Sequence, residues 1–177
     1  MRTAEQSPIG HARRSNGSVR YFVIVASVVV TLVLLKIFLV EPVAIDGSAL
    51  EPGLRDGDRV FLTKQFSRIS RGDVVLFGDP RKPSIRILER VVGLPGERIQ
   101  LREGVLYVDR EPIPEPYVSA DHNVKKSEID EIEVPKDAYF MLGDNRDEAF
   151  DSRNLGPISK ELIYAKYWVR YWPPGSR

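Results

Sequence analysis

Few side chains in this sequence can act as nucleophiles, bases or metal ligands. The 177 residues include no cysteine and two histidines, His11 and His122. Thiol nucleophiles, disulfides, iron–sulfur clusters and cysteine-ligated zinc are therefore excluded, and so is a metal site built from several histidines. A Ser-His-Asp triad could use only His122, because His11 lies in a terminal tail. No metal or other cofactor is expected.

The charge balance excludes one large class of function. Lys plus Arg total 26 and Asp plus Glu total 25, which gives a net charge of +1. This balance rules out a nucleic-acid binder that depends on a generally basic surface. The charge is unevenly distributed, since residues 1–40 hold five basic residues and one acidic residue, whereas residues 41–177 carry an acidic excess. The asymmetry indicates that the two parts occupy different environments.

Residues 20–40 form a predicted transmembrane helix that follows a basic tail at residues 1–19. No residue from Tyr21 to Leu35 is charged, and the ammonium of Lys36 is near enough to the end to reach the headgroups. About 20 helical residues span roughly 30 Å, the thickness of the hydrocarbon core of a bilayer. The alternative is a cleaved signal peptide, with Gly47-Ser48-Ala49 as its processing site. The length of the apolar run favours a retained single-pass anchor in the cell membrane, with a cytoplasmic N-terminus and an extracytoplasmic main domain.

Short apolar runs separated by turn residues follow Pro42 and predict a mostly β domain over residues 41–177. Strands are expected at residues 59–63, 73–77, 85–93, 98–101, 105–108, 138–142 and 162–172. The fourth and fifth of these should form a hairpin, because Gly104 lies in the short segment that joins them. The charged, proline-containing segment at about residues 113–136 is expected to be a solvated excursion.

Period-two alternation in the last predicted strand puts aromatic and basic side chains on one face. They are Tyr164, Lys166, Trp168, Arg170 and Trp172. Such a face suits the headgroup region of a bilayer, because amphipathic rings favour that interface. A half-buried strand with two exposed cations is an equally good interpretation.

Three sequence blocks, in this order, carry a resemblance to a known family. The first runs from Gly47 to Leu54 (GSALEPGL), the second from Ile87 to Glu97 (ILERVVGLPGE) and the third from Gly143 to Arg153 (GDNRDEAFDSR). They resemble the patterns Gly-x-Ser-Met-x-Pro-Thr-Leu, Lys-Arg-Val-Ile-Gly-Leu-Pro-Gly-Asp and Gly-Asp-Asn-Arg-Asp-x-Ser-x-Asp-Ser-Arg of bacterial type I signal peptidases. These are membrane-anchored serine endopeptidases that remove signal peptides from exported precursors. The resemblance covers about residues 20–172 and implies the β domain of that family behind a single transmembrane helix.

The chemistry of that family uses a serine nucleophile and a neutral lysine base, and this sequence lacks both. The resemblance puts Ala49 at the nucleophile position, Glu89 at the general-base position and Ala149 at the position of a serine that orients the base. Alanine has no oxygen that can attack a carbonyl, and a glutamate supplies no neutral amine. The protein is therefore expected to be a catalytically inactive member of the family.

Other motif residues are retained, and the resemblance implies that they support the site. They are Ser48, Pro52, Arg90, Asp147, Asp151, Ser152 and Arg153. Burial of a lone carboxylate is costly, so we expect Glu89 to pair with Arg153, while Arg90 points to the other face of the strand. The alternative is a Glu89 side chain that turns to solvent and pairs with nothing.

Three functions remain open at this point. In the first, the protein binds signal-peptide-bearing precursors or pilin-like proteins without cleaving them. In the second, it is an active signal peptidase with a displaced nucleophile, for which Ser48 is the candidate, or with a mutated site. In the third, it is a non-catalytic structural module. The lipid bilayer is an expected partner, nucleic acid is not, and the retained motifs mildly favour the first function.

Overall fold

The computed structural model describes residues 17–173, apart from the side chains of residues 35–38. The chain divides into two compact units, Met1–Lys36 and Ile37–Arg177. Of the basic tail expected at residues 1–19, residues 1–16 lie outside the described residues. The same holds for the Lys36 side chain.

Helix α1 covers Gly17–Leu39 and contains the predicted apolar segment. Its residues 17–34 are long and apolar enough to cross a membrane, and none of them is buried within the structure. An apolar helix of this length satisfies its backbone hydrogen bonds internally, as lipid requires. It is consistent with a single-pass membrane protein.

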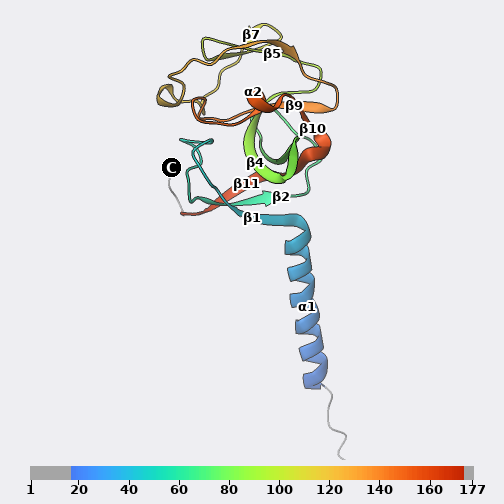
Figure 1. Ribbon diagram of the computed structural model, residues 1–177. Helices are drawn as coiled ribbons and strands as arrows, with labels where there is room; N and C mark the ends of the chain where they lie inside the picture. The colour runs from blue at the N-terminus through green and yellow to red at the C-terminus, as the bar shows by residue number, and fades with distance from the viewer. Residues whose placement is uncertain (1–16, 174–177) are drawn as a thin grey trace, which may run out of the picture. The chain divides into compact units, whose positions relative to one another are not determined.

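Two antiparallel sheets form the second unit (Figure 1). The larger sheet has the strand order β1-β2-β11-β3-β4-β9-β10, and the smaller has the order β7-β6-β5-β8. The strands of the larger sheet are β1 (Val40–Ala44), β2 (Arg59–Thr63), β3 (Val74–Asp79), β4 (Lys82–Gly93), β9 (Ala138–Leu142), β10 (Ile158–Ser159) and β11 (Ile163–Trp172). Those of the smaller sheet are β5 (Arg98–Arg102), β6 (Val105–Val108), β7 (Glu111–Pro112) and β8 (Ile129–Glu133). The mostly β fold predicted from the sequence is confirmed.

Three short helical turns connect the strands. They are η1 (Ala120–His122), α2 (Ser152–Leu155) and η2 (Lys160–Leu162). Helix α2 begins at Asp151, whose side chain accepts a hydrogen bond from the Arg153 backbone N–H and so caps the first turn. It starts in the last two residues of the third sequence block and continues to Leu155, where no helix was predicted.

The predicted hairpin is confirmed, with Leu101 opposite Leu106 in the β5–β6 pair. The segment at residues 113–136 differs from expectation, because it contains β8, which pairs with β5. Ile129 and Ile132 pack against the core of the smaller sheet, and Val134 is fully buried. The description of this segment as a solvated excursion is therefore wrong for its last third. Strand β8 has the sequence IDEIE, in which three charged residues surround two isoleucines. The apolar pattern was therefore too weak to predict a strand.

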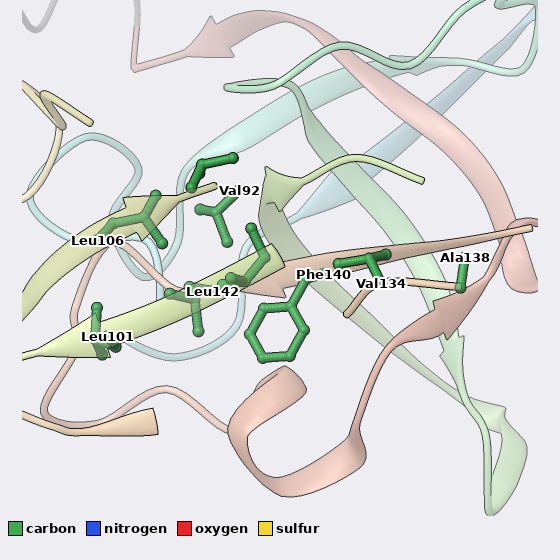
Figure 2. Packing of buried hydrophobic residues seen from close by; sticks show 9 residues of the cluster. Val92, Leu101, Leu106, Val134, Ala138, Phe140 and Leu142 are labelled. Atoms are coloured by element: carbon green, nitrogen blue, oxygen red, sulfur yellow. The ribbon is translucent and has the colours of Figure 1, made fainter. Parts of the chain in front are cut away.

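Strands β3 and β9 are covered on both faces, and every one of their residues is buried. In β9, Phe140 and Leu142 face a cluster shared with the smaller sheet, shown in Figure 2. The intervening Tyr139 and Met141 belong to a second cluster on the opposite face. Such alternation is what a strand between two apolar layers requires. It fixes the strand that leads directly into the third sequence block.

Strand β11 does not keep the single alternating face expected from its sequence. Its pairing with β2 shifts register between Tyr167 and Val169 and again between Arg170 and Trp172. The two cations of that face are engaged, Lys166 with Asp73 at 2.7 Å and Arg170 with Asp58 at 2.8 Å. The interpretation as a half-buried strand with two exposed cations is therefore wrong in the exposure of the cations, because their side chains are 29% and 20% exposed and carboxylates from neighbouring segments reach them.

Candidate functional site

A cleft of about 760 Å³ lies beside the first sequence block. One wall is formed by Glu41 and residues 43–50, and the other by residues 85–89 of β4. Leu76, Asp79, Arg81, Glu148 and Phe150 complete the lining. The cleft thus gathers the first and second blocks with part of the third, which are far apart in the sequence.

Two strand edges with unpaired backbone groups border this cleft. Strand β1 pairs only with β2, so its other edge is free. Strand β4 pairs with β9 only from Arg90 to Gly93, which leaves residues 86–89 paired on their β3 side alone. Free edges of this kind offer N–H and C=O groups to an added strand. The cleft is therefore shaped for an extended chain.

The three positions assigned to the family's nucleophile, base and orienting serine meet at Gly143. A Cβ atom on Gly143 would lie 2.2 Å from the Cβ of Ala149, 2.7 Å from the carbonyl oxygen of Ala49 and 3.0 Å from Oε2 of Glu89. The residue must be glycine, because these atoms occupy the space that a side chain needs. The backbone N–H of Asn145 also donates to the Ala49 carbonyl at 2.9 Å, which ties the first block to the third.

Glu89 is buried, with 1% of its surface exposed, and borders the cleft. Among the described residues, its Oε2 atom has no hydrogen-bond partner. Burial raises the pKa of this carboxyl well above its ordinary value, and the negative charges of Asp151 and Asp144 raise it further. The cations Arg153 and Arg90 oppose the shift without reversing it. The surroundings of the carboxyl thus favour its neutral form over its charged form.

Both expectations for the partner of Glu89 are wrong. The side chain does not turn to solvent, and Arg153 pairs with Asp151 instead, from Nε to Oδ1 and from Nη2 to Oδ2, each at 2.9 Å. Arg153 also donates from Nη1 to Ser127 Oγ at 2.8 Å and to the Arg146 carbonyl oxygen. Asp151 is only two residues away from Arg153 in the sequence. Its carboxylate therefore binds the guanidinium of Arg153 in place of Glu89.

The retained motif residues hold the backbone of the third block in place. Oδ2 of Asp151 accepts a hydrogen bond from the Gly143 N–H at 2.9 Å, and Ser152 Oγ accepts one from the Met141 N–H at 2.9 Å. Asp147 accepts from the backbone N–H groups of Val124 at 2.8 Å and Lys125 at 2.9 Å. These bonds fix the position of Gly143 and Ala149 relative to the sheet.

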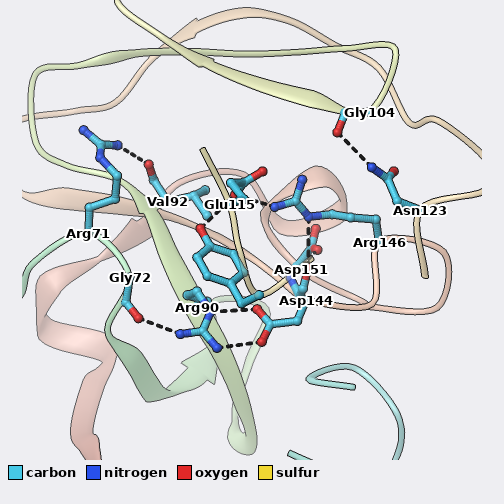
Figure 3. A network of polar contacts seen from close by, with 12 residues as sticks. Arg71, Gly72, Arg90, Val92, Gly104, Glu115, Asn123, Asp144, Arg146 and Asp151 are labelled. Atoms are coloured by element: carbon cyan, nitrogen blue, oxygen red, sulfur yellow. Dashed lines mark hydrogen bonds and ion pairs between the residues drawn. The ribbon is translucent and has the colours of Figure 1, made fainter. Parts of the chain in front are cut away.

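Arg90 starts a polar network that joins β4 to the third block (Figure 3). Its Nε and Nη2 atoms donate to the two oxygens of Asp144 at 2.7 and 2.6 Å, and its Nη1 donates to the Gly72 carbonyl at 2.8 Å. The guanidinium lies over the ring of Tyr117, 4.2 Å from its centroid. Tyr117 donates in turn to Glu115 at 2.8 Å, and Glu115 also accepts from the buried Arg146.

Sequence reasoning missed several members of this network. Asp144 and Arg146 were quoted as motif residues without a role, and Glu115 and Tyr117 fell in the segment expected to be solvated. Burial raises the pKa of the Tyr117 phenol, as does the nearby Glu115 carboxylate. Pro112, Pro114 and Pro116 surround these residues and predict no regular element there, so no local signal marked them.

Among the described residues, Ser48 makes no hydrogen bond to a base. Ser48 lines the cleft, but none of the described residues hydrogen-bonds its hydroxyl. His122 lies between Ser119 Oγ, 2.7 Å from its Nδ1, and Glu51 Oε2, 3.5 Å from its Nε2. Neither Ser119 nor His122 belongs to the cleft lining. Within residues 17–173, no three His, Asp or Glu side chains are grouped so that they could hold a metal ion.

Pro52 follows the first block's alanine by three residues and has a cis peptide bond with Glu51. The turn around it is closed by a hydrogen bond from the Leu54 N–H to the Leu50 carbonyl at 2.9 Å. Leu50 and Leu54 are buried in the core beside β2. The first block is thereby anchored on both sides of Ala49.

Comparison with known proteins agrees with the motifs. The family described as "Signal peptidase, peptidase S26" matches residues 18–172. "Signal peptidase I" of Bacillus amyloliquefaciens is 34% identical over 97% of this chain and 95% of that protein. "Signal peptidase I P" of Bacillus subtilis subsp. natto is 36% identical over 85% of this chain and 86% of that protein.

A solved structure of a signal peptidase I from Enterococcus faecalis V583 is 30% identical and covers 57% of this chain and 97% of its own, with a TM-score of 0.49. The family match spans most of the described chain. The chain belongs to the signal peptidase family, peptidase S26.

Proposed function

We propose that this protein is a membrane-anchored member of the signal peptidase family that binds extended peptides without cleaving them. One observation carries the proposal: the cleft is open and bordered by two free strand edges, yet Ala49, Glu89 and Ala149 meet beside it with no nucleophile among them. Recognition and cleavage are thus separable in this chain.

The cleft suits an apolar extended segment. Val43, Ile45, Leu76, Ile85 and Ile87 contribute apolar surface, while the free edges of β1 and β4 supply backbone hydrogen bonds. Peptides that add a strand in this way gain affinity from main-chain bonds and selectivity from side-chain pockets. Signal-peptide-bearing precursors and pilin-like proteins are the proposed clients, since the relatives are signal peptidases.

The absence of cleavage follows from the chemistry of the three positions. Acyl transfer from a peptide needs a nucleophilic oxygen, which Ala49 lacks. Glu89 has no amine, and its burial disfavours the charged carboxylate that could accept a proton, so it is a poor replacement for a neutral amine as general base. The retained hydrogen bonds of Asp147, Asp151 and Ser152 preserve the shape of the site in the absence of this chemistry.

The proposed location is the cell membrane, with α1 as a single anchor. Basic residues precede the apolar segment, and the positive-inside rule then puts the N-terminus in the cytoplasm and the β domain outside. The lipid bilayer is accordingly a partner of α1, and a bound precursor would meet the domain as it leaves the membrane.

The test measures binding and cleavage in the same sample. The full chain in detergent micelles is titrated into a fluorescent precursor peptide with an Ala-x-Ala site, and mass spectrometry follows any product. We expect saturable binding and no product. Ile85→Glu, which puts a charge on the cleft wall, should weaken binding about tenfold, whereas Val105→Glu should not. Ile85 and Val105 are similarly exposed, 47% and 43%, and Val105 lies in the smaller sheet.

Two outcomes would contradict the proposal. Absence of saturable binding would favour a structural module. Product that disappears in Ser48→Ala would instead favour an active peptidase with a displaced nucleophile.

A further inference from the structure

Phe150 is a large apolar side chain to which the motifs assign no role. It follows Ala149 directly, lines the cleft and is 45% exposed. Single exposed apolar side chains are common on protein surfaces, so the exposure of Phe150 carries no conclusion by itself. What distinguishes Phe150 is its contact with a cation that also lines the cleft.

That cation is Arg81, whose guanidinium lies over the ring of Phe150 with its Cζ atom 5.1 Å from the centroid. A guanidinium within about 6 Å of a ring centroid is attracted by the negative face of the ring. Arg81 belongs to the turn between β3, which ends at Asp79, and β4, which begins at Lys82. The contact therefore joins this turn to the third sequence block within the lining of the cleft.

Asp79 fixes the guanidinium at its edge. Nε of Arg81 donates to Oδ1 of Asp79 at 3.3 Å and Nη2 donates to Oδ2 at 3.2 Å, while the backbone N–H of Arg81 donates to Oδ1 at 2.8 Å. The side chain of Asp79 is 8% exposed, whereas that of Arg81 is 62% exposed. A buried carboxylate thus holds the cation in place, while the side of the guanidinium that Phe150 does not cover is accessible.

We propose that Arg81 and Phe150 form a subsite for an aromatic side chain of an extended peptide bound in the cleft. The ring of the peptide would stack on the accessible side of the guanidinium, which would then lie between two rings. This inference rests on the peptide binding proposed above and names a feature of the peptide. Because Asp79 already orders Arg81, little conformational entropy is lost when the third ring system arrives.

An aromatic side chain suits this pair better than an aliphatic or an acidic one. The guanidinium group is weakly hydrated and stacks readily on aromatic faces. An aliphatic side chain could pack beside Phe150 but would gain nothing from the cation. An acidic side chain would meet Asp79, which already neutralises Arg81, and the carboxylates of Asp46 and Glu148, which also line the cleft.

The preference should be confined to one position of the peptide. Successive side chains of an extended chain point to opposite faces, and those on the same face are about 7 Å apart. When the backbone of the peptide pairs with the free edges of β1 and β4, one side chain is therefore in reach of Arg81 and Phe150. General adhesion of aromatic peptides to the cleft would show no such dependence on position.

The test uses ten fluorescent decapeptides of alanine, serine and valine, each with one phenylalanine at a different position. A matched set carries cyclohexylalanine at the same positions, which has the same carbon skeleton and is apolar but has no π electrons. Fluorescence anisotropy measures the affinity of each peptide for the full chain in micelles. We expect phenylalanine to bind about fivefold more tightly than cyclohexylalanine at one position, and no more tightly elsewhere.

Two variants and a matched control assign the preference to the pair. Arg81→Gln removes the cation and should bring the affinity ratio at that position to about one. Phe150→Leu keeps an apolar side chain but removes the ring under the guanidinium, and it should also lower the ratio. The control is Arg102→Gln, because Arg102 lies 4.5 Å from the ring centroid of Tyr107 and neither residue lines the cleft. This control should leave the ratio at fivefold.

Thermal melting checks that each variant is folded. Arg81→Gln should fold, since the backbone N–H at this position still donates to Asp79. An unchanged ratio in folded Arg81→Gln or Phe150→Leu would overturn the inference. So would equal affinities for phenylalanine and cyclohexylalanine at every position in the unmodified protein, which would leave peptide binding intact. Failure of both peptide sets to bind would overturn peptide binding and the inference together.

Discussion

Arg153 donates two hydrogen bonds of 2.9 Å to the carboxylate of Asp151. Because its guanidinium is bound there, it does not pair with Glu89. Asp151 is fully buried and also accepts from the N–H of Gly143, so neither member of the pair is free to move toward Glu89. The buried carboxyl at the family's base position therefore makes no ion pair among the described residues, and burial raises its pKa. The stability of the protein should reflect this.

Glu89→Gln should stabilise the protein at alkaline pH rather than destabilise it. The folded pKa of Glu89 is raised above its unfolded value, so the folded state binds the extra proton, and stability falls as pH rises from about 4.5 through the folded pKa. Glutamine removes this loss, by about 1.4 kcal/mol for each pH unit of the rise. Thermal melting of the full chain in micelles at pH 5 and pH 8 measures the difference.

The control Glu148→Gln changes an exposed carboxylate paired with Lys125 and should show no such pH dependence. A lower melting temperature for Glu89→Gln at pH 8 would mean that the carboxylate is ionised and paired.

Asp144→Asn should destabilise the protein strongly, because it leaves the guanidinium of Arg90 without its charged partner. The side chains of Arg90 and Asp144 are 16% and 0% exposed, and breaking a buried pair from one side costs about 3–5 kcal/mol. The control is Glu41→Gln, which breaks the more exposed contact with Arg86 at the rim of the cleft and should cost about 1 kcal/mol or less. Melting curves of the two variants compare the costs directly. Similar small losses in both would show that Arg90 is adequately solvated without Asp144.

Gly143→Ala should disrupt the junction of the three blocks. The new Cβ would lie 2.2 Å from Ala149 Cβ and 2.7 Å from the Ala49 carbonyl, and the second of these is backbone that cannot rotate away. Overpacking of this kind costs about 1–3 kcal/mol or more. Gly53→Ala is the matched control, since its Cβ would meet its nearest neighbours at 3.6 and 3.7 Å, an ordinary contact distance. We expect a fall in melting temperature and in peptide affinity for Gly143→Ala alone, and equal behaviour of the two variants would contradict the close packing.

Restoring the family's residues should restore cleavage only in combination. Ala49→Ser by itself should give no useful turnover, because Glu89 still supplies no amine. Ala49→Ser with Glu89→Lys should cleave a precursor slowly, and Ala149→Ser should increase the rate by orienting the amine. General-base catalysis contributes about 10²–10⁴-fold to the rate. The cleavage rate of Ala49→Ser alone should therefore be lower than that of the double variant by this factor. Appreciable product from Ala49→Ser alone, measured by mass spectrometry, would show that another group acts as the base.

The β domain should be accessible from outside the cytoplasm. Four arginines precede or begin the apolar segment, and the positive-inside rule retains them in the cytoplasm. A protease added to cells with a permeable outer layer should digest residues 41–177 and spare an epitope tag at the N-terminus. Digestion of the tag with protection of the domain would reverse the proposed orientation.

Local patterns in the sequence were sufficient to predict the elements that depend on local interactions. The apolar run predicted α1, alternation and Gly104 predicted the β5–β6 hairpin, and the ordered motifs indicated the family. Strand β8 escaped prediction because its pairing with β5 supplies the stability that its charged sequence does not. The free edge of β4 beside the cleft was equally invisible, since it depends on where β9 stops pairing.

The sequence by itself determined that Ala49, Glu89 and Ala149 lack the family's nucleophile and base, because chemical identity is a property of the residue alone. Only the tertiary structure decided how these positions meet at Gly143 and that Arg153 serves Asp151 rather than Glu89. Ion-pair choice depends on competition in space among several acceptors, and here the acceptor two residues away prevails over one 64 positions distant in the sequence. The burial of Glu89 depends likewise on strand β3, which pairs with it, and on Gly143 of the third block, which lies beside it. The pKa of a carboxyl follows from such surroundings, which no local pattern contains.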